Sequence, residues 1–438
     1  MTDLSIEQRF PAVFRQSLAK RFLPLVLLIG VVLYFAYAVW FFALPNVLAD
    51  AKWDRAGNML AQWISYDIST EFRLDGATIE PKWPRFGPLG NDPNPDWIIA
   101  EGNGATTVEI AGPGTATTFS KANVSVTYEG QTVVIHRGEV PRIEGAQPDW
   151  LAIKGSDVVA DFGFAGNVRV SPERVKINKR VLGWANFVFD TNSPYFGKSA
   201  GEVWALLWNP ERLDPNHSNL ELAFDNIWNN GSWQHGDVWV KLLQTIVMAL
   251  VGTLFASLIA FPLAFFAARN ITPSGFANHG VKRFFDFLRS VDMLIWALFF
   301  TRAFGPGPLA GIGAIFLTEV GTLGKLYSEG LENIDDKERE GIKSVGASPT
   351  QVQRYGVVPQ VLPVMISQTL YQWESNTRSA TIIGAVGAGG IGLKLWEAMR
   401  TNSNWANVFY MVILILIVVF VFDNISNALR SRLIGRQQ

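Results

Sequence analysis

Long apolar runs alternate with polar segments along the second half of the chain, and one further run lies near the N-terminus. A helix needs about 20 apolar residues to cross a hydrocarbon core of roughly 30 Å. The stretches that approach or exceed this length are 22–44, 242–268, 293–323, 355–387 and 401–422. Because the sequence GPGP at 305–308 divides the third stretch into two short spans, the pattern predicts an α-helical polytopic membrane protein with about six transmembrane helices.

The run at 22–44 has two interpretations, a signal peptide or a retained membrane anchor. A signal peptide has an apolar region of only about 7–15 residues, followed by a small-residue cleavage site. This run is longer, follows the basic residues Lys20 and Arg21, and has no clear small-x-small site after it. We therefore predict a retained anchor.

Basic residues set the expected orientation, because cytoplasmic loops carry an excess of Lys and Arg. With six spans, most basic residues of the short loops and tails fall on one side, and they outnumber Lys394 and Arg400 on the other. Both ends are then cytoplasmic. The expected divisions are a cytoplasmic segment 1–21, a first transmembrane helix 22–44, an extracytoplasmic insert 45–238, a core transmembrane domain 239–430 with cytoplasmic helices at 332–358, and a cytoplasmic tail 431–438.

The predicted insert alternates apolar and polar residues as half-buried strands do. Strands are expected at 123–129, 131–136, 167–171 and 174–178. The C-terminal part of the insert is predicted to form short helices at 201–208 and 219–228, and it is rich in tryptophan. Its tryptophans include Trp204, Trp208, Trp228, Trp233 and Trp239. We expect a small β-rich domain, followed by short helices whose tryptophans pack internally or lie at the membrane interface.

A polar segment with helix-capping residues separates the third apolar stretch from the fourth. Asp335 begins a capping-box pattern, and Gly346 stands where a left-handed residue would end that helix. Ser348 and Gln351 form a second capping box at the start of another helix. The local pattern leaves two interpretations open: a well-capped connection between two spans, or a helix pair that engages a cytoplasmic partner.

The spacing of Glu340, Gly346 and Pro359 resembles the cytoplasmic coupling signature of binding-protein-dependent ABC importer permeases, with Gly341 and Ile342 where that family has two alanines. Pro359 also marks the approach to the next span. The segments YGVVPQVLP and TLYQWESNTRSATIIGAVGAGGIG are similar to the phosphonate importer permease, and the resemblance covers residues 240 to 430. It implies the type I ABC importer permease fold, with a loop that inserts into a groove of a cytosolic ATPase. The residues that it implies for ATPase coupling are Glu340, Gly341, Ser344, Gly346, Ala347, Ser348 and Pro359.

Two polar lines run along the predicted helix at 365–385. One contains Gln368, Gln372, Ser375 and Ser379, with Asn376 on its flank. The other contains Glu374 and Arg378, which have the favourable i, i+4 order for an ion pair. A charge at mid-bilayer costs about 2.5–3.5 kcal/mol, so such residues normally face a path or a neighbouring helix. Arg378 is expected to meet an oxyanion through its planar fork, and a purely structural Glu374–Arg378 pair is the alternative.

Charged residues also occur in or near the third apolar stretch. Asp292, Arg302 and Glu319 are expected to form a further structural network, and Arg302 is also a path candidate. The residues predicted to line the translocation path are Gln372, Glu374, Ser375, Asn376, Arg378, Ser379 and Arg302.

Glycine is concentrated at 384–392, directly after the polar helix. Such a sequence permits close backbone approach, a tight turn, or a re-entrant element shielded by protein. The predicted gate or turn residues are Gly387, Gly389, Gly390 and Gly392. No Lys-Ser/Thr pair follows them, and the Gly-Lys-Ser at 197–199 lacks the earlier glycine of a phosphate-binding loop, so ATP binding by this chain is not expected.

Composition removes several function classes. The chain has a formal net charge of −1 and no cysteine, which argues against nucleic-acid binding and excludes disulfides and thiolate metal sites. Its four histidines are scattered, and no metal or nucleophile motif is present. We expect no catalytic residue, no metal and no cofactor in this chain, and a membrane-bound hydrolase remains as an alternative.

The resemblance implies a multi-pass permease subunit in the lipid bilayer of a bacterial inner membrane. It implies a homodimer that works with a cytoplasmic ABC ATPase dimer, which binds ATP and Mg, and with a periplasmic phosphonate-binding protein. The expected substrate is phosphonate or a related small phosphorus oxyanion. The alternatives are a permease for phosphite, a phosphate ester or a methionine-like solute, and a membrane sensor with an external ligand-binding domain.

Overall fold

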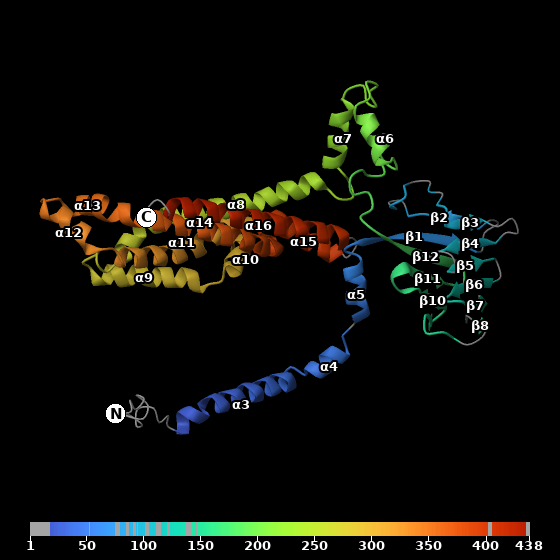
Figure 1. The fold of residues 1–438 in the computed structure, drawn as a ribbon, viewed down its shortest axis with the longest axis horizontal. Coiled ribbons are helices and arrows are strands. Elements are labelled where there is room, and N and C mark those ends of the chain that lie inside the picture. The colour runs from blue at the N-terminus through green and yellow to red at the C-terminus, as the bar shows by residue number, and fades with distance from the viewer. Residues whose placement is uncertain are drawn as a thin grey trace, which may run out of the picture. The chain divides into compact units, whose positions relative to one another are not determined.

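The computed structural model describes most of the chain. It covers residues 18–51, 53–74, 79–84, 87–90, 93, 95–100, 105–110, 115–120, 123–136, 142–144, 147–401 and 405–434. Residues 1–17 and 435–438 of the two predicted cytoplasmic ends lie outside this range. The chain divides into two units, one up to Leu60 and one from Ala61 (Figure 1).

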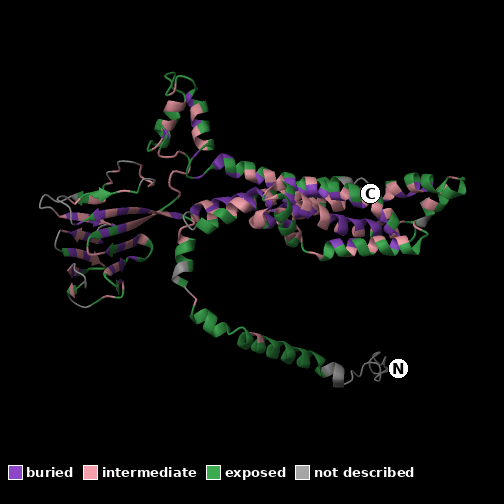
Figure 2. Ribbon diagram, turned by 180° about the vertical axis from the view of Figure 1, so that it is seen from behind, coloured by how far each residue is buried: buried purple, intermediate pink, exposed green. Residues whose placement is uncertain are grey.

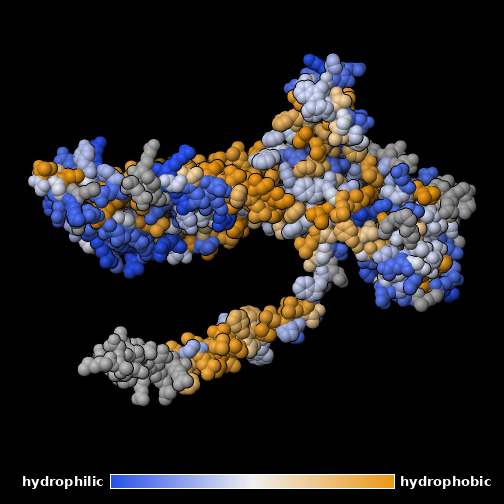
Figure 3. Space-filling model, in the orientation of Figure 1, coloured by the Kyte–Doolittle hydropathy of each residue, from blue (hydrophilic) through white to orange (hydrophobic). Residues whose placement is uncertain are grey.

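An exposed apolar helix makes up most of the N-terminal unit. Its helices are α3 (Leu18–Phe41), α4 (Leu44–Ala49) and α5 (Trp53–Ala61). The stretch Phe22–Phe41 is long and apolar enough to cross a membrane and has no buried residue; it is green in Figure 2 and orange in Figure 3. A helix that is apolar all round requires an apolar surrounding. A helix long and apolar enough for the predicted first span is therefore present; it ends at Phe41 rather than at 44, and Ala43 has a left-handed conformation (φ 47°) before α4.

Two antiparallel sheets occupy the first part of the second unit (Figure 1). The strands are β1 (Ser65–Arg73), β2 (Pro81–Lys82), β3 (Ile98–Ala100), β4 (Thr106–Glu109), β5 (Ala116–Phe119), β6 (Asn123–Tyr128), β7 (Gln131–His136), β8 (Arg142–Glu144), β9 (Leu151–Lys154), β10 (Asp157–Asp161), β11 (Gly166–Val170) and β12 (Arg174–Leu182). Among the described residues, one sheet has the strand order β2-β1-β12-β11-β10-β9 and the other β3-β4-β5-β6-β7-β8. The strands predicted at 123–129, 131–136, 167–171 and 174–178 correspond to β6, β7, β11 and β12.

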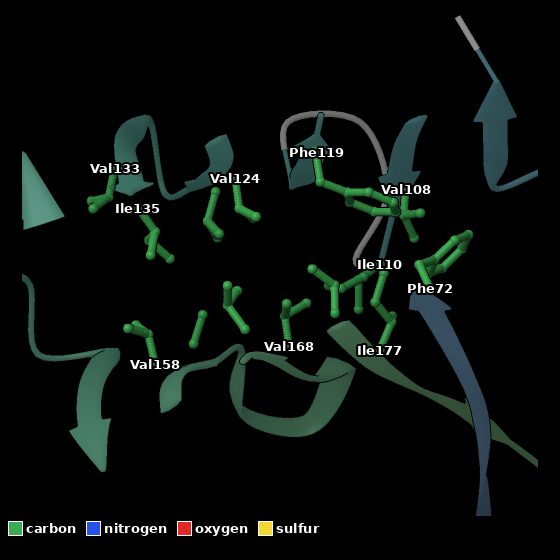
Figure 4. Close-up of a cluster of buried hydrophobic side chains, with 14 of the residues drawn as sticks. Phe72, Val108, Ile110, Phe119, Val124, Val133, Ile135, Val158, Val168 and Ile177 are labelled. Atoms are coloured by element: carbon green, nitrogen blue, oxygen red, sulfur yellow. The ribbon is translucent and has the colours of Figure 1, made fainter. Parts of the chain in front are cut away.

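The two sheets face each other across one apolar core. Alternate residues of β6 and β7, such as Val124 and Ile135, are fully buried, as expected for strands with one covered face. Figure 4 shows these side chains opposite Val158 and Val168 of the other sheet. The apolar positions of this alternating pattern therefore form the core between the two sheets.

Residues 183–234 connect the sheets to the membrane helices. They include α6 (Ala200–Leu207) and α7 (Asn219–Trp228). Ser199 caps α6 in a capping box with Glu202, and the hydrogen bonds from Ser199 lower the pKa of the Glu202 carboxyl. Trp204 and Trp208 are exposed on α6, whereas Trp233 is buried. The predicted set of tryptophans thus divides into exposed residues and an internal packing residue.

Aromatic residues of this connection pack against the two long helices that contain His235 and Tyr410. Trp233 packs against Trp184 and Phe187, with ring centroids 5.2 and 4.8 Å away. His235, at the start of the helix α8, bonds the Tyr410 hydroxyl (2.8 Å) and the Phe187 carbonyl (2.7 Å) through its two ring nitrogens. A buried imidazole with both nitrogens bonded orders the backbone around it.

The remaining elements are helical. They are α8 (His235–Ala267), α9 (Gly275–Ser290), α10 (Met293–Phe304), α11 (Pro308–Glu332), α12 (Asp336–Ser344), α13 (Pro349–Val352), α14 (Val358–Ile383), α15 (Gly390–Thr401) and α16 (Trp405–Ile434), with π-helical turns at Gln353–Val357 and Gly384–Ala388. Small residues let the long helices approach closely: a Cβ on Gly252 of α8 would lie 2.8 Å from Ile315 of α11. Close packing through small residues is typical of membrane helices.

The number of spans differs from the predicted six. Among the described residues, four helices are long and apolar enough to cross a membrane, and up to five if the bent pair before and after Gly389 counts as one. The third apolar stretch does break at 305–308, as predicted, but α10 has only 12 residues while α11 has 25. The expectation of two short spans there is wrong for the second one, because the helix after the break continues past Leu323 to Glu332.

Asn230 provides a test of how the connection is held. Its buried amide donates to the Asn186 carbonyl (2.9 Å) and accepts from the Ser232 and Trp233 backbone N–H groups (3.0 and 2.9 Å). Asn230→Ala leaves these groups unpaired, and we expect a loss of about 1–3 kcal/mol of stability. Thermal unfolding of the purified chain, followed by tryptophan fluorescence, measures this loss. Asn229→Ala, at the exposed neighbouring position, is the control; equal stability of the two variants would contradict the account.

Candidate functional site

The polar segment between α11 and α14 forms the capped helix pair that the sequence predicts. Asp335 accepts the Lys337 N–H (3.0 Å) at the start of α12, and Gly346 adopts φ 83° just after its end. The Ser348 N–H and hydroxyl both donate to Gln351 Oε1, at 2.8 and 3.0 Å. These interactions fix the turn between α12 and α13.

The helix pair presents an exposed tip. Val345, between the two helices, exposes 82% of its surface. The predicted coupling residues Glu340, Gly341, Ser344, Gly346 and Ser348 are exposed, and Ala347 is partly exposed. The Ser344 hydroxyl donates to the Gly341 carbonyl (2.7 Å), which closes the last turn of α12. An apolar side chain held in solvent on a rigid turn is suited to contact another protein.

Polar contacts join the base of this loop to the connection between α8 and α9. Glu332, the last residue of α11, accepts the Arg269 N–H (2.8 Å) and the Lys282 ammonium (2.7 Å). Arg339 of α12 donates to the Asn270 carbonyl (3.3 Å). The base of the loop is therefore held by two neighbouring segments.

The connection from the helix pair into the membrane helix is a continuous helix. α13, the π-helical turn Gln353–Val357 and α14 follow one another without a break, and Pro359 lies in the first turn of α14. The prediction that Pro359 marks the approach to the span agrees with this position. The wider π turn precedes the proline, whose ring excludes a normal helical bond at that point.

The two polar lines on α14 are present, but the expected Glu374–Arg378 ion pair is wrong. Glu374 instead pairs with Arg430 of α16 at 3.3 Å, and Arg378 pairs with Asp423 of α16 at 3.7 Å. Arg430 also lies over the Tyr371 ring, 5.5 Å from its centroid. Each charge of α14 thus finds its partner across a helix interface, where a neighbouring helix has brought an opposite charge into reach.

The predicted path residues differ in how much of their surface is exposed. Asn376 is buried, with 2% of its surface exposed, and donates to Thr253 Oγ1 of α8 (2.9 Å). The Arg378 side chain is 57% exposed, whereas that of Glu374 is 13% exposed. Gln372, Ser375 and Ser379 are partly exposed. Arg378 and these three neighbours retain surface for a ligand in the single chain, while Asn376 serves as a contact between helices.

Hydrogen-bonded hydroxyl groups join α8, α11 and α14. The Tyr327 hydroxyl lies 2.9 Å from Ser257 and also bonds Thr369. Glu319 of α11 is also buried, with 4% of its surface exposed, and its Oε2 has no hydrogen-bond partner among the described residues. The Tyr327 hydroxyl, in contrast, is satisfied by hydroxyl groups of two neighbouring helices, as buried polar groups normally are.

The expected network of Asp292, Arg302 and Glu319 is not formed. Asp292 caps α10 by accepting the Leu294 N–H (2.8 Å), and Arg302 is exposed on the same helix. Glu319 is buried on α11. Asp292 and Arg302 stand at opposite ends of α10, ten residues or about 15 Å apart, and Glu319 lies on the next helix, beyond the break at 305–308.

The predicted glycine turn is present between α14 and α15. The π-helical turn Gly384–Ala388 leads to Gly389 and Gly390, and the helices on either side meet at 57°. Gly387, Gly389 and Gly390 have φ values of 101°, 84° and 70°, which glycine adopts without strain. Gly392 has no room for a side chain, because a Cβ there would overlap the Thr381 carbonyl.

This turn packs against the break between α10 and α11. The Gly307 N–H donates to the Gly387 carbonyl (2.9 Å), and a Cβ on Gly389 would lie 3.0 Å from the backbone of Gly307 and Pro308. On the other side, Thr245 of α8 accepts the Ile391 N–H (2.9 Å) at the start of α15. Two irregular backbone segments therefore satisfy each other within the helical unit, as irregular backbone at membrane depth requires.

Sequence reasoning missed Asp423 and Arg430, the partners of the α14 charges. The predicted last apolar stretch ends at 422, before Asp423, and neither residue is assigned a role from the sequence. The available signal is their spacing: they are separated by two helical turns, which places them on one face of a continued helix. In the structure α16 does continue to Ile434.

The helices, breaks and charge pairs define a class of protein, with several helices long and apolar enough to cross a membrane and one exposed, capped helix pair. Residues 260–435 match the model of the family of binding-protein-dependent transport system inner membrane components. The phosphite transport system permease protein PtxC of Stutzerimonas stutzeri is 36% identical over 194 residues, covering 44% of this chain and 70% of that protein. An Escherichia coli relative named for a cryptic phosphonate transport system, PhnE2, is 45% identical over 121 residues, covering 28% of this chain and 98% of the relative.

The chain belongs to this family of inner membrane transport components. It spans about two thirds of the length of the phosphite-transport relatives that it matches, 66% of one and 70% of another. An inward-facing structure of the MetNI methionine ABC transporter is similar with a TM-score of 0.40 and 20% identity, over 45% of this chain and 95% of that one. The family resemblance derived from the sequence is confirmed.

The Glu374–Arg430 pair can be tested by removing one charge. Arg430→Gln leaves the largely buried Glu374 without its cation, and we expect a loss of about 1–3 kcal/mol of stability. Glu374→Gln in the same chain should recover much of it. Thermal unfolding in detergent measures both effects, with Arg432→Gln, an exposed position on the same helix, as the control. An additive double variant would show that the two residues do not interact.

The packed glycine turn can be tested with two glycines of the same backbone conformation. Gly389→Ala brings a Cβ against Gly307 and Pro308, whereas Gly305→Ala, at nearly the same φ, meets open space. Both substitutions carry the strain of a left-handed residue, about 1–2 kcal/mol, and Gly389→Ala should cost about 1–3 kcal/mol more because its backbone contacts cannot relax. Equal thermal unfolding temperatures for the two variants would contradict the packing described.

Proposed function

We propose that the chain is the membrane-spanning permease subunit of an ATP-driven importer for phosphonate or a related small phosphorus oxyanion. The observation that carries this proposal is the family match over 260–435, which contains the exposed helix pair, α14 and the glycine turn. Relatives named for phosphite and phosphonate transport support the substrate class.

In this proposal the chain works as a homodimer with a cytoplasmic ABC ATPase dimer and a periplasmic binding protein. ATP and Mg are bound by the ATPase, and the permease supplies the path. The exposed helix pair is the contact with the ATPase, and Val345 is its central apolar side chain. The continuous helix from Pro349 to Ile383 carries movement of that contact into the membrane.

The path residues of this proposal lie on α14. Arg378 is the cation that meets the oxyanion, because its guanidinium is half-exposed and held by Asp423 at 3.7 Å. Gln372, Ser375 and Ser379 provide hydrogen bonds along the same helix. A partly paired arginine favours weak, reversible contact, which a transport path needs.

The proposal is tested by reconstitution in lipid with the candidate ATPase and binding protein. ATP hydrolysis is measured with methylphosphonate, phosphite, phosphate and methionine in turn. The importer proposal expects stimulation by a phosphorus oxyanion. If the chain binds no ATPase, or if no ligand alters ATP turnover, the proposal fails and a membrane sensor becomes the better account.

A substitution at the loop tip tests the coupling contact. Val345→Asp places a charge in the proposed apolar contact, and we expect a tenfold or greater fall in ligand-stimulated ATP hydrolysis, equivalent to about 1.4 kcal/mol. The exposed position should leave the thermal stability of the permease unchanged. Val188→Asp, which alters an exposed valine of the 183–234 connection, is the control. Normal stimulation in Val345→Asp would contradict the assigned contact.

A further inference from the structure

A cluster of three cations surrounds one carboxylate where α9 packs against α11. Asp286 of α9 lies 3.0 Å from Lys325 Nζ, 3.4 Å from Arg283 Nη1 and 3.6 Å from Arg289 Nε. Three positive charges against one negative charge leave an excess of two. Clustered like charges raise the local potential and favour an additional anion.

Backbone packing fixes the position of these charges. A Cβ on Gly321 of α11 would lie 2.7 Å from the Phe285 carbonyl oxygen and 2.9 Å from the Arg289 nitrogen. The Phe285 ring occupies the space beside Gly324. Because α9 approaches α11 this closely, Asp286 and Arg289 are held opposite Lys325 rather than brought together by flexible side chains alone.

The neighbouring Lys282, on the same helix, is neutralised by a carboxylate of its own. Its ammonium group lies 2.7 Å from Glu332. Among the described residues, the ion pairs of Arg283, Arg289 and Lys325 all converge on Asp286. The His279 ring, 3.5 Å from Arg283 Nε, adds no negative charge to this group.

A hollow lies directly beside the cluster. Its volume is about 560 Å³, and it is lined by Arg283, Asp286, Arg289, Ser290 and Thr322. The Arg283 and Arg289 side chains are 69% and 45% exposed, so both guanidinium groups remain accessible. Arginine presents paired N–H donors that match the geometry of two oxygens on one phosphorus.

We propose that this hollow binds a phosphorus oxyanion, with Arg283 and Arg289 as the direct ligands and Lys325 as a supporting charge. Asp286 orients the cations and keeps binding weak by competing for them. Two sources share this chemistry: a free oxyanion that has left the path, and the headgroup of an anionic phospholipid. The first source rests on the proposed transport function, and the second does not.

The position along α11 is consistent with either source. Lys325 precedes Glu332, the last residue of α11, by seven residues, or about 10 Å of helix. In the proposed orientation that end of α11 is cytoplasmic. The cluster then lies near the inner membrane surface, where a released oxyanion and a lipid headgroup are both available.

Binding is measured on the purified chain without ATPase or binding protein, so that failure of the site and failure of the transport function are distinguishable. One arm titrates inorganic phosphite into phosphatidylcholine nanodiscs that contain the chain. The other measures retention of phosphatidylglycerol against phosphatidylcholine by native mass spectrometry. The proposal expects saturable binding in at least one arm, reduced tenfold or more by Arg289→Gln and by high salt.

Two further variants separate a binding site from a structural cluster. Asp286→Asn removes the competing carboxylate, so binding should strengthen several-fold even if the variant is less stable. Arg432→Gln, an exposed arginine on α16, should leave binding unchanged. Absence of binding in both arms, or binding that Arg289→Gln and Asp286→Asn leave unaltered, would overturn the proposal. Phosphatidylglycerol retention alone would identify the lipid headgroup as the ligand.

Discussion

Satisfaction of polar groups on α14 is the constraint on which the membrane part of this chain depends. The helix carries Glu374 and Asn376 at largely buried positions, where an unpaired charge or amide is costly, and the half-exposed Arg378 beside them. The structure pairs the two charges with Arg430 and Asp423 of α16 and bonds the amide to Thr253 of α8. The same contacts that satisfy the polar groups also determine which helices stand beside α14.

The irregular backbone segments follow from the same requirement. The π turn before Pro359 lets one helix run without a break from the exposed loop into α14. At the other end, the glycine turn after α14 bonds to the break before α11, and Thr245 of α8 caps α15. The helix is thus held at its sides and at its far end. In the proposed function, the exposed helix pair that precedes its near end is where the ATPase makes contact.

Much of this organisation could be predicted from local patterns. Capping residues around Ser348 and Gly346 act over three or four positions, and the structure has the turn that they specify. Apolar alternation identified β6, β7, β11 and β12 for the same reason. The ion pairs of α14 could not be predicted in this way, since Glu374 and Arg430 are separated by 56 residues and meet only through helix packing. The i, i+4 spacing of Glu374 and Arg378 predicts an ion pair within α14, whereas the observed ion pairs form between α14 and α16. In the proposed function, the exposed residues on α14 act together with a second chain and an ATPase, which no local pattern in this sequence describes.

In the proposed importer, ATP binding by the ATPase moves the turn between α12 and α13 and, through α14, the glycine turn Gly384–Ala388 before α15. The chain has no cysteine, so spin labels can be placed singly at Lys343 on the loop side and at Glu397 of α15. Pulsed electron spin resonance on the assembled transporter would measure the label-to-label distance between the two protomers at each site. The account predicts that ATP trapping shortens the distance at Lys343 and lengthens the distance at Glu397. Unchanged distances at both sites, in a complex shown to bind ATP, would contradict it.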